Sequence, residues 1–103
     1  MRKLLALPIQ IPFKRLEDFC KSHEIDKLSL FGSVLTEDFT STSDIDLLVE
    51  FVKGKTPGLA IIDLQDELSQ MLGREVDLRT PAELSRFFRD KVLAEAVVLY
   101  VQD

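Results

Sequence analysis

Two aspartates separated by one residue, Asp44 and Asp46, stand at the start of an apolar run typical of a buried strand. Successive side chains of a strand project to opposite faces, so both carboxylates are expected on one face while Ile45 points to the other. Like charges held this close repel, and each raises the proton affinity of the other unless a cation lies between them. A hard divalent cation such as Mg²⁺, which prefers oxygen ligands, would remove the repulsion. The spacing therefore predicts a metal-binding pair of carboxylates.

A glycine-serine turn precedes this pair. Gly32 and Ser33 follow the apolar run 28–31, which we expect to be a strand. Gly32 has no side chain to keep a ligand from the backbone, and Ser33 adds a hydroxyl and an N–H that can open a short helix, so the turn can hold a phosphate. Taken alone, the dipeptide favours an ordinary turn between a strand and a helix. Together with the two carboxylates, it indicates a site for a metal-bound nucleoside triphosphate.

A third carboxylate, Asp77, lies in a later short apolar segment between Val76 and Leu78. An isolated aspartate in a short strand usually faces water at a sheet edge. The apolar residues on both sides and the two earlier carboxylates favour a functional role for Asp77 instead.

The pattern resembles a known signature. Gly32-Ser33, ten intervening residues and then Asp44-x-Asp46 is similar to the GS-x10-D-x-D motif of the polymerase-beta-like nucleotidyltransferase superfamily, and the short chain resembles its minimal branch, the MNT proteins. The resemblance implies an α/β (α+β) fold with a small mixed central sheet and helices packed on it. It also implies a third carboxylate on a later strand, the position that Asp77 fills.

The resemblance implies nucleotidyl transfer, in which a hydroxyl attacks the α-phosphate of a nucleoside triphosphate and pyrophosphate leaves. Asp44, Asp46 and Asp77 would be the catalytic carboxylates and the ligands of two Mg²⁺ ions, and Asp77 would help to deprotonate the acceptor hydroxyl. Gly32 and Ser33 would hold the β- and γ-phosphates. The family further implies ATP as substrate and an antitoxin role, with AMP transferred to a tyrosine of a HEPN-type ribonuclease toxin in a hetero-oligomer.

One departure from the family pattern bears on activity. Minimal members often read G-S-x-A-R-G, whereas this chain has Thr36 at the arginine position and Glu37 at the glycine position. A threonine cannot supply the charge and planar donors of an arginine, and Glu37 adds a negative charge beside a polyanion. Lys53 or Lys55 could supply a compensating cation. The alternative function is therefore an MNT-fold antitoxin with weak or no catalysis that neutralises its partner by binding alone.

Composition limits the remaining classes of function. The 103 residues are expected to form a single domain with an N-terminal arm at residues 1–11, too short for a separate acceptor-binding domain. A formal charge of −5 argues against direct nucleic-acid binding. One cysteine, Cys20, excludes an intrachain disulfide and is expected in the core. The apolar start of the chain is short and is broken by Pro8, so we expect a cytoplasmic protein without a signal peptide or membrane span.

Hydrophobic periodicity and capping residues predict the elements that would position the motif. The last segment, residues 96–101, fits either a strand or the end of a helix. The helix expected after Thr80 would place Leu84, Phe87 and Phe88 in the core. In chain order, the expected elements are a helix from Pro12, strands at 27–31 and 44–51, a helix from Thr56-Pro57 to Gly73, a strand within 74–79, and a helix opening at the capping box Thr80-Pro81-Ala82-Glu83.

Overall fold

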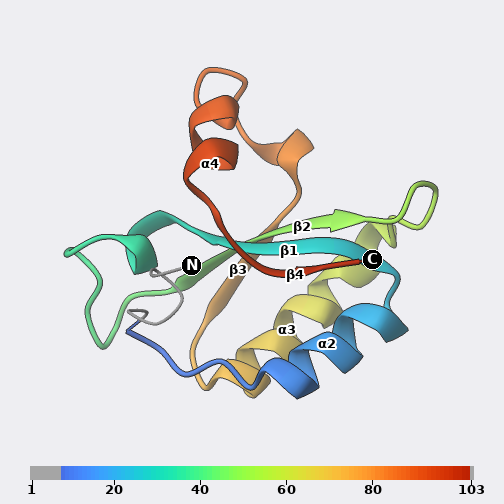
Figure 1. Cartoon of the computed structure of the whole chain (residues 1–103), viewed down its shortest axis with the longest axis horizontal. Helices are drawn as coiled ribbons and strands as arrows, with labels where there is room; N and C mark the ends of the chain where they lie inside the picture. The colour runs from blue at the N-terminus through green and yellow to red at the C-terminus, as the bar shows by residue number, and fades with distance from the viewer. Residues whose placement is uncertain (1–7, 103) are drawn as a thin grey trace.

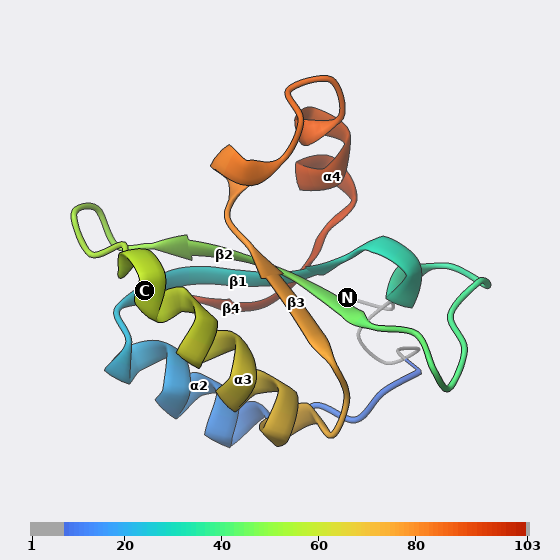
Figure 2. The ribbon, with the colours of Figure 1, turned by 180° about the vertical axis from the view of Figure 1, so that it is seen from behind.

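The computed structural model describes residues 8–102, which fold into one mixed four-stranded sheet with the order β3-β2-β1-β4 (Figure 1). Helices α2 and α3 run side by side along one face of the sheet, and the segment that carries α4 rises from the opposite face (Figure 2). The expected small mixed sheet with packed helices is confirmed. No helix in this range has the length and apolar character needed to cross a membrane.

The sheet combines two antiparallel pairings with one parallel pairing. Strand β1 (Ile25–Phe31) pairs antiparallel with β2 (Ile45–Phe51) on one side and with β4 (Val97–Val101) on the other. Strand β2 pairs in parallel with β3 (Val76–Arg79). All three predicted strands are present, and the ambiguous segment 96–101 forms a strand.

The two long helices each bury an apolar stripe. Helix α2 (Phe13–Ser22) buries Leu16, Phe19 and Cys20. Helix α3 (Ile61–Leu72) buries Leu64 and Leu68, and it ends as predicted at Gly73, whose left-handed conformation at φ +70° suits glycine.

The predicted start of the second helix at Thr56-Pro57 is wrong. Gly58 has a left-handed φ of +66°, which takes the chain out of the helical conformation directly after Pro57. A short 3₁₀ turn, η2 (Gly58–Ala60), follows and leads into α3 without a side-chain cap. The helix therefore begins at Ile61.

The predicted helix after Thr80 is also wrong in extent, although its capping box is present. The Thr80 backbone N–H donates to Glu83 Oε1 at 2.8 Å, but only one 3₁₀ turn, η3 (Pro81–Glu83), forms because Leu84 is extended. The chain then leaves the sheet, so Phe87 and Phe88 are 85% and 56% exposed rather than part of the core. The last helix, α4 (Arg89–Glu95), forms in the projecting segment.

The core lies between the sheet and the helices α2 and α3. Cys20 is fully buried there, and burial raises the pKa of its thiol to about 12, which agrees with a packing role. Ile9 and Ile11 of the expected N-terminal arm pack against the core, and the rest of that arm, residues 1–7, falls outside the described residues. The sheet residues of the core are Ile25, Leu28, Leu30, Ile45, Leu47, Val49, Val76 and Leu78.

This packing yields a prediction for stability. Leu68 is completely buried on α3, so Leu68→Ala should lower the free energy of unfolding by about 2–5 kcal/mol through lost burial and the cavity left behind. Leu59 is 88% exposed, and Leu59→Ala should change it by no more than about 0.5 kcal/mol. Urea denaturation of both variants checks the prediction, and equal effects would contradict the position of the core.

Candidate functional site

Strand register brings two of the three predicted carboxylates together. Asp46 on β2 lies directly beside Asp77 on β3, and Phe31 at the end of β1 is the antiparallel partner of Asp46. The neighbours of these aspartates in sequence, Ile45 and Val76 among them, belong to the core. Since strand side chains alternate, Asp46 and Asp77 project from the face opposite α2 and α3, the same side as α4.

Asp46 is the most constrained of these groups, because its carboxylate lies against the backbone of Gly32. A Cβ added to Gly32 would lie 3.0 Å from Asp46 Cγ and closer still to one carboxylate oxygen. Gly32 also has a left-handed φ of +78°, which side chains rarely adopt. Glycine at this position is therefore required both by the backbone conformation and by the approach of the carboxylate.

Electrostatics at Asp46 follow from this crowding. Burial raises the pKa of the Asp46 carboxyl above its ordinary value, and the negative charges of Asp77 and Asp44 raise it further. The positive charge of Arg79 and a hydrogen bond from the Ser33 backbone act in the opposite direction. The site thus holds Asp46 in an environment that favours a compensating positive charge.

Asp77 has a cationic neighbour on its own strand. Arg79 Nε and Nη2 both donate to Asp77 Oδ2 at 3.2 Å. Both side chains are half exposed, so water screens this ion pair. The third predicted carboxylate is therefore held by an arginine.

Asp44 immediately precedes β2, and its side chain is exposed. It is close enough to Asp46 to affect the pKa of that group. Within residues 8–102, no group of three or more His, Cys, Asp or Glu side chains is arranged to hold a metal ion. Asp77 pairs with Arg79 instead, and the assignment of the three aspartates to a metal site stays a prediction.

The turn after β1 forms a short 3₁₀ helix, η1 (Gly32–Leu35), as expected for the glycine-serine dipeptide. The Thr36 hydroxyl donates to the Ser33 carbonyl at 2.9 Å and so ends this turn. Thr36 therefore acts as a structural cap at the position where the related motif carries an arginine, and Glu37 is exposed beyond it.

The loop between the turn and β2 is fastened by one arginine. Arg74 Nη1 donates to the carbonyls of Thr40 and Ser43 at 3.0 and 3.2 Å, and its guanidinium lies over the Phe39 ring at 4.6 Å. These contacts attach the loop to the chain between α3 and β3. They hold the loop before Asp44 in place beside the candidate site.

The suggestion that Lys53 or Lys55 supplies a cation to the site is wrong. Both follow the far end of β2, so about 20 Å of strand separates Lys53 from Asp46. Lys55 Nζ lies 3.7 Å from Glu24 Oε2, at that far end of the sheet.

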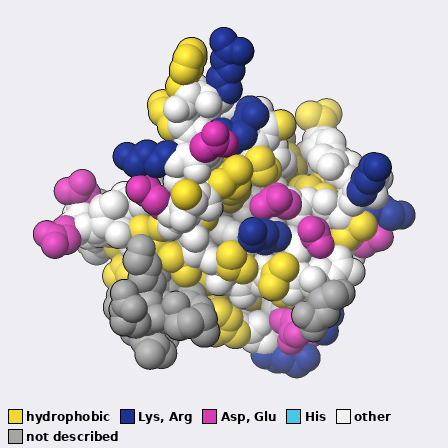
Figure 3. Space-filling model, turned by 45° about the horizontal axis from the view of Figure 1, so that its top comes forward, with side chains coloured by type: hydrophobic (Ala, Val, Ile, Leu, Met, Phe, Trp, Pro, Cys, Tyr) yellow, Lys and Arg dark blue, Asp and Glu magenta, His cyan; other side chains and the backbone are white. Residues whose placement is uncertain are grey.

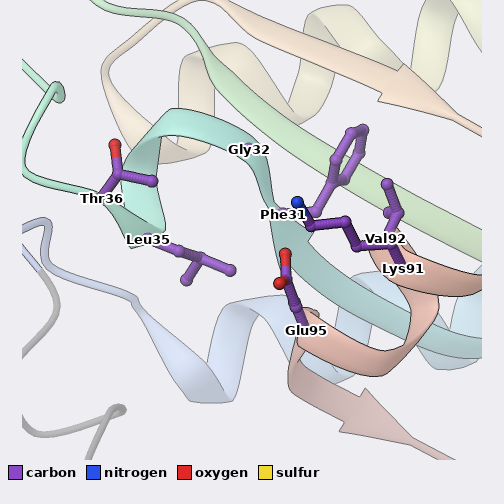
Figure 4. A pocket seen from close by; sticks show the side chains of 7 residues that line it. All are labelled: Phe31, Gly32, Leu35, Thr36, Lys91, Val92 and Glu95. Atoms are coloured by element: carbon purple, nitrogen blue, oxygen red, sulfur yellow. The ribbon is translucent and has the colours of Figure 1, made fainter. Parts of the chain in front are cut away.

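A pocket of about 590 Å³ opens beside the glycine-serine turn. Its walls are Phe31, Gly32, Leu35 and Thr36 from the end of β1 and η1, and Lys91, Val92 and Glu95 from α4 (Figure 4). Volumes of this size suit small-molecule ligands. Sequence reasoning missed Lys91 and Glu95, because residues 90–95 carry no motif and reach the site only through the fold.

Charges on the α4 side of the molecule are mixed in sign. Acidic and basic side chains are interspersed across this face rather than gathered into a basic stripe (Figure 3).

The family model of the polymerase beta nucleotidyltransferase domain matches residues 14–103. The chain belongs to this nucleotidyltransferase family. The match includes the glycine-serine turn and all three aspartates, so the resemblance drawn from the motif is confirmed.

Relatives and solved structures agree with this membership. A Methanocaldococcus jannaschii protein, provisionally named a protein adenylyltransferase, is 41% identical over 73% of this chain and 80% of its own length. A solved structure provisionally described as a minimal nucleotidyltransferase is 33% identical, with a TM-score of 0.68 over 82% of this chain and 86% of that one. A complex of a tri-AMPylated Shewanella oneidensis HEPN toxin with its MNT antitoxin matches with a TM-score of 0.62, 21% identity and coverage of 87% and 70%.

The close approach of Gly32 and Asp46 yields a prediction. Gly32→Ala should lower the free energy of unfolding by about 1–2 kcal/mol through its left-handed φ and by a further amount because Asp46 must move. Gly54 has a similar φ of +81° with open space around it, so Gly54→Ala carries only the backbone cost. Denaturation curves of the two variants measure the difference, and equal losses would show that Asp46 does not press on Gly32.

The burial of Asp46 and its repulsion by the neighbouring carboxylates predict a gain in stability on neutralisation. Because the pKa of Asp46 is raised in the folded state, its ionised form is destabilising at neutral pH, and this penalty shrinks as the pH falls toward the ordinary value of 3.8. Without metal, the double variant Asp44→Asn, Asp46→Asn should therefore be at least as stable as the parent at pH 7, with a difference that narrows in acid. Denaturation at several pH values tests this, and a less stable variant at pH 7 would count against clustered carboxylates.

Proposed function

We propose that the protein is a metal-dependent nucleotidyltransferase. It transfers AMP from ATP to the hydroxyl group of a tyrosine in a HEPN-type toxin and so acts as an antitoxin. The observation that carries the proposal is the meeting of Asp46, Asp77 and the Gly32 backbone on one face of the sheet. Family membership supports the reaction class. One buried free thiol agrees with action in the reducing cytoplasm.

The residues of the site fit a magnesium nucleotide. Mg²⁺ is usually bound by one or two carboxylates together with substrate phosphates and water, so a complete protein cage is not needed. Asp44 and Asp46 would hold Mg²⁺, and the burial and neighbouring negative charges that raise the pKa of Asp46 favour a cation beside it. Two bound ions would stabilise charge on the attacking and leaving oxygens of the transfer.

Gly32 and Ser33 have a positioning role in this proposal. The bare backbone of Gly32 lets a phosphate approach as closely as the Asp46 carboxylate does now, and the Ser33 N–H is a donor at the same point. The triphosphate would thus lie along η1 with its α-phosphate beside Asp46. In that position, the phosphate and the carboxylates share the same cations.

Asp77 would orient the acceptor hydroxyl and take its proton. Its present partner, Arg79, is screened and half exposed, so the pair can open without a large energetic cost. Once released, Arg79 would be free to donate to a phosphate oxygen, a role to which a guanidinium is suited. In this arrangement, Arg79 on β3 would lie near the phosphate group that reacts.

The acceptor would be brought by a partner protein. The Shewanella oneidensis complex, whose antitoxin shares this fold, contains a HEPN toxin modified by AMP. The Methanocaldococcus jannaschii relative carries a name of the same reaction type. A hetero-oligomer with a HEPN-type toxin, without direct contact to nucleic acid, is therefore the partner arrangement that we propose.

A second candidate, an antitoxin that neutralises its partner by contact alone, is favoured by one observation. Residues 32–37 include no lysine or arginine, and the Thr36 hydroxyl donates to the Ser33 carbonyl, so the turn offers no side-chain cation to the triphosphate. Weak nucleotide binding would follow unless a positive charge reaches the turn from another element.

Intact-mass spectrometry distinguishes the two functions. The purified protein is incubated with the toxin encoded beside it, Mg²⁺ and each nucleoside triphosphate in turn. We expect mass gains on the toxin in steps of one AMP with ATP. In the double variant Asp44→Asn, Asp46→Asn the rate should fall by at least about 100-fold, because charge stabilisation in the transition state is lost.

The control is complex formation by the same double variant, measured by size-exclusion chromatography. Both substitutions keep side-chain size, so the complex should persist. A stable complex of the parent with no mass gain under any nucleotide would overturn the transferase and leave the binding antitoxin. Full toxin neutralisation by the double variant would overturn the enzymatic account of antitoxin action.

A further inference from the structure

The glycine-serine turn lacks a cation, although the ligand proposed for it is a polyanion. Thr36 caps η1, Glu37 is negative, and Lys53 and Lys55 lie beyond the far end of β2. The phosphates that lie away from the metal ions would then be bound by backbone N–H groups alone. These groups would balance little of the negative charge. A cation from another element is the feature that this site needs.

Helix α4 supplies such a cation. Its Lys91 side chain extends toward Phe31 and Gly32 and forms one wall of the pocket beside η1 (Figure 4). Within the described part of the chain, no carboxylate lies within ion-pair distance of Lys91. Its ammonium group is thus available to a ligand in the pocket.

The rest of the pocket combines apolar walls with one acidic side chain. Phe31, Leu35 and Val92 provide apolar surface for a ribose or a base, and the volume of about 590 Å³ admits a mononucleotide. Glu95 lies one helical turn after Lys91 on the same face of α4 and points into the pocket (Figure 4). Gly32 borders both this pocket and the Asp46 carboxylate, so a ligand here adjoins the carboxylate site.

We propose that the pocket between η1 and α4 binds the nucleoside triphosphate and that Lys91 is its phosphate-binding cation, in place of the arginine that η1 lacks. Lys91 pairs with the β- and γ-phosphate oxygens, while Glu95 opposes their charge and limits affinity. This inference rests on the proposed function, since it takes the ligand to be the nucleotide substrate. In this proposal, Lys91 of α4 binds the phosphates and the aspartates catalyse the transfer.

Calorimetric titration with AMP-PNP and Mg²⁺ tests the assignment. Lys91→Gln should raise the Kd by about 10-fold, the usual worth of one charge-assisted hydrogen bond, and should flatten the dependence of Kd on salt. Lys91→Arg should keep most of the affinity, because a cation remains. Glu95→Gln should bind more tightly than the parent, a gain that a purely structural role for this helix face would not produce.

The matched control is Lys55→Gln, which removes an exposed lysine far from the pocket and should leave the Kd unchanged. Equal Kd values for the parent and Lys91→Gln would overturn the role of Lys91, while nucleotide binding by the parent would keep the proposed function intact. A parent that neither binds AMP-PNP nor transfers AMP would overturn both. Equal losses in Lys91→Gln and Lys55→Gln would show only a general charge effect and would also overturn the assignment.

Discussion

The antiparallel pairing of β1 with β2 is the contact on which the site depends. Its register places Phe31 opposite Asp46. The Asp46 carboxylate therefore lies directly against the backbone of the next residue, Gly32. The core on the other face holds this register, because a slip of one residue would expose Leu47 and Val49 and bury the aspartate. The same apolar packing that stabilises the domain thus determines where the Gly32 backbone meets the Asp46 carboxylate.

The site keeps its negative charges together at an energetic cost that the surrounding structure reduces. The cost is visible in the raised pKa of Asp46, and Arg79 and the Ser33 N–H reduce it without removing it. Arg79 also holds Asp77, so one cation of the protein itself lies among these carboxylates. A magnesium nucleotide would replace this arrangement with one in which the positive and negative charges are more nearly balanced.

Local patterns predicted the features that depend on neighbours in sequence. Strand alternation placed Asp46 on the face away from the core, and helical periodicity found α2 and most of α3. The errors arose where one residue's backbone conformation overrides periodicity: Gly58 delays α3, and the extended Leu84 turns Phe87 and Phe88 out to solvent. Lys91 could not be found, because its approach to Gly32 depends on the fold, which brings together residues 59 positions apart, rather than on a local pattern.

The Arg74 contacts carry a consequence for how this motif can diverge. Phe31 and Asp46 are partners in the antiparallel pairing of β1 with β2. This pairing does not depend on how many residues the connecting loop contains. The ten-residue spacing of the motif is therefore not required by its chemistry; it matches the loop that Arg74 holds at Thr40, Ser43 and Phe39. A homologue that loses this arginine could lengthen the loop at a small entropic cost and keep its aspartates in place. Signature searches that demand the fixed spacing would then pass over chemically intact members.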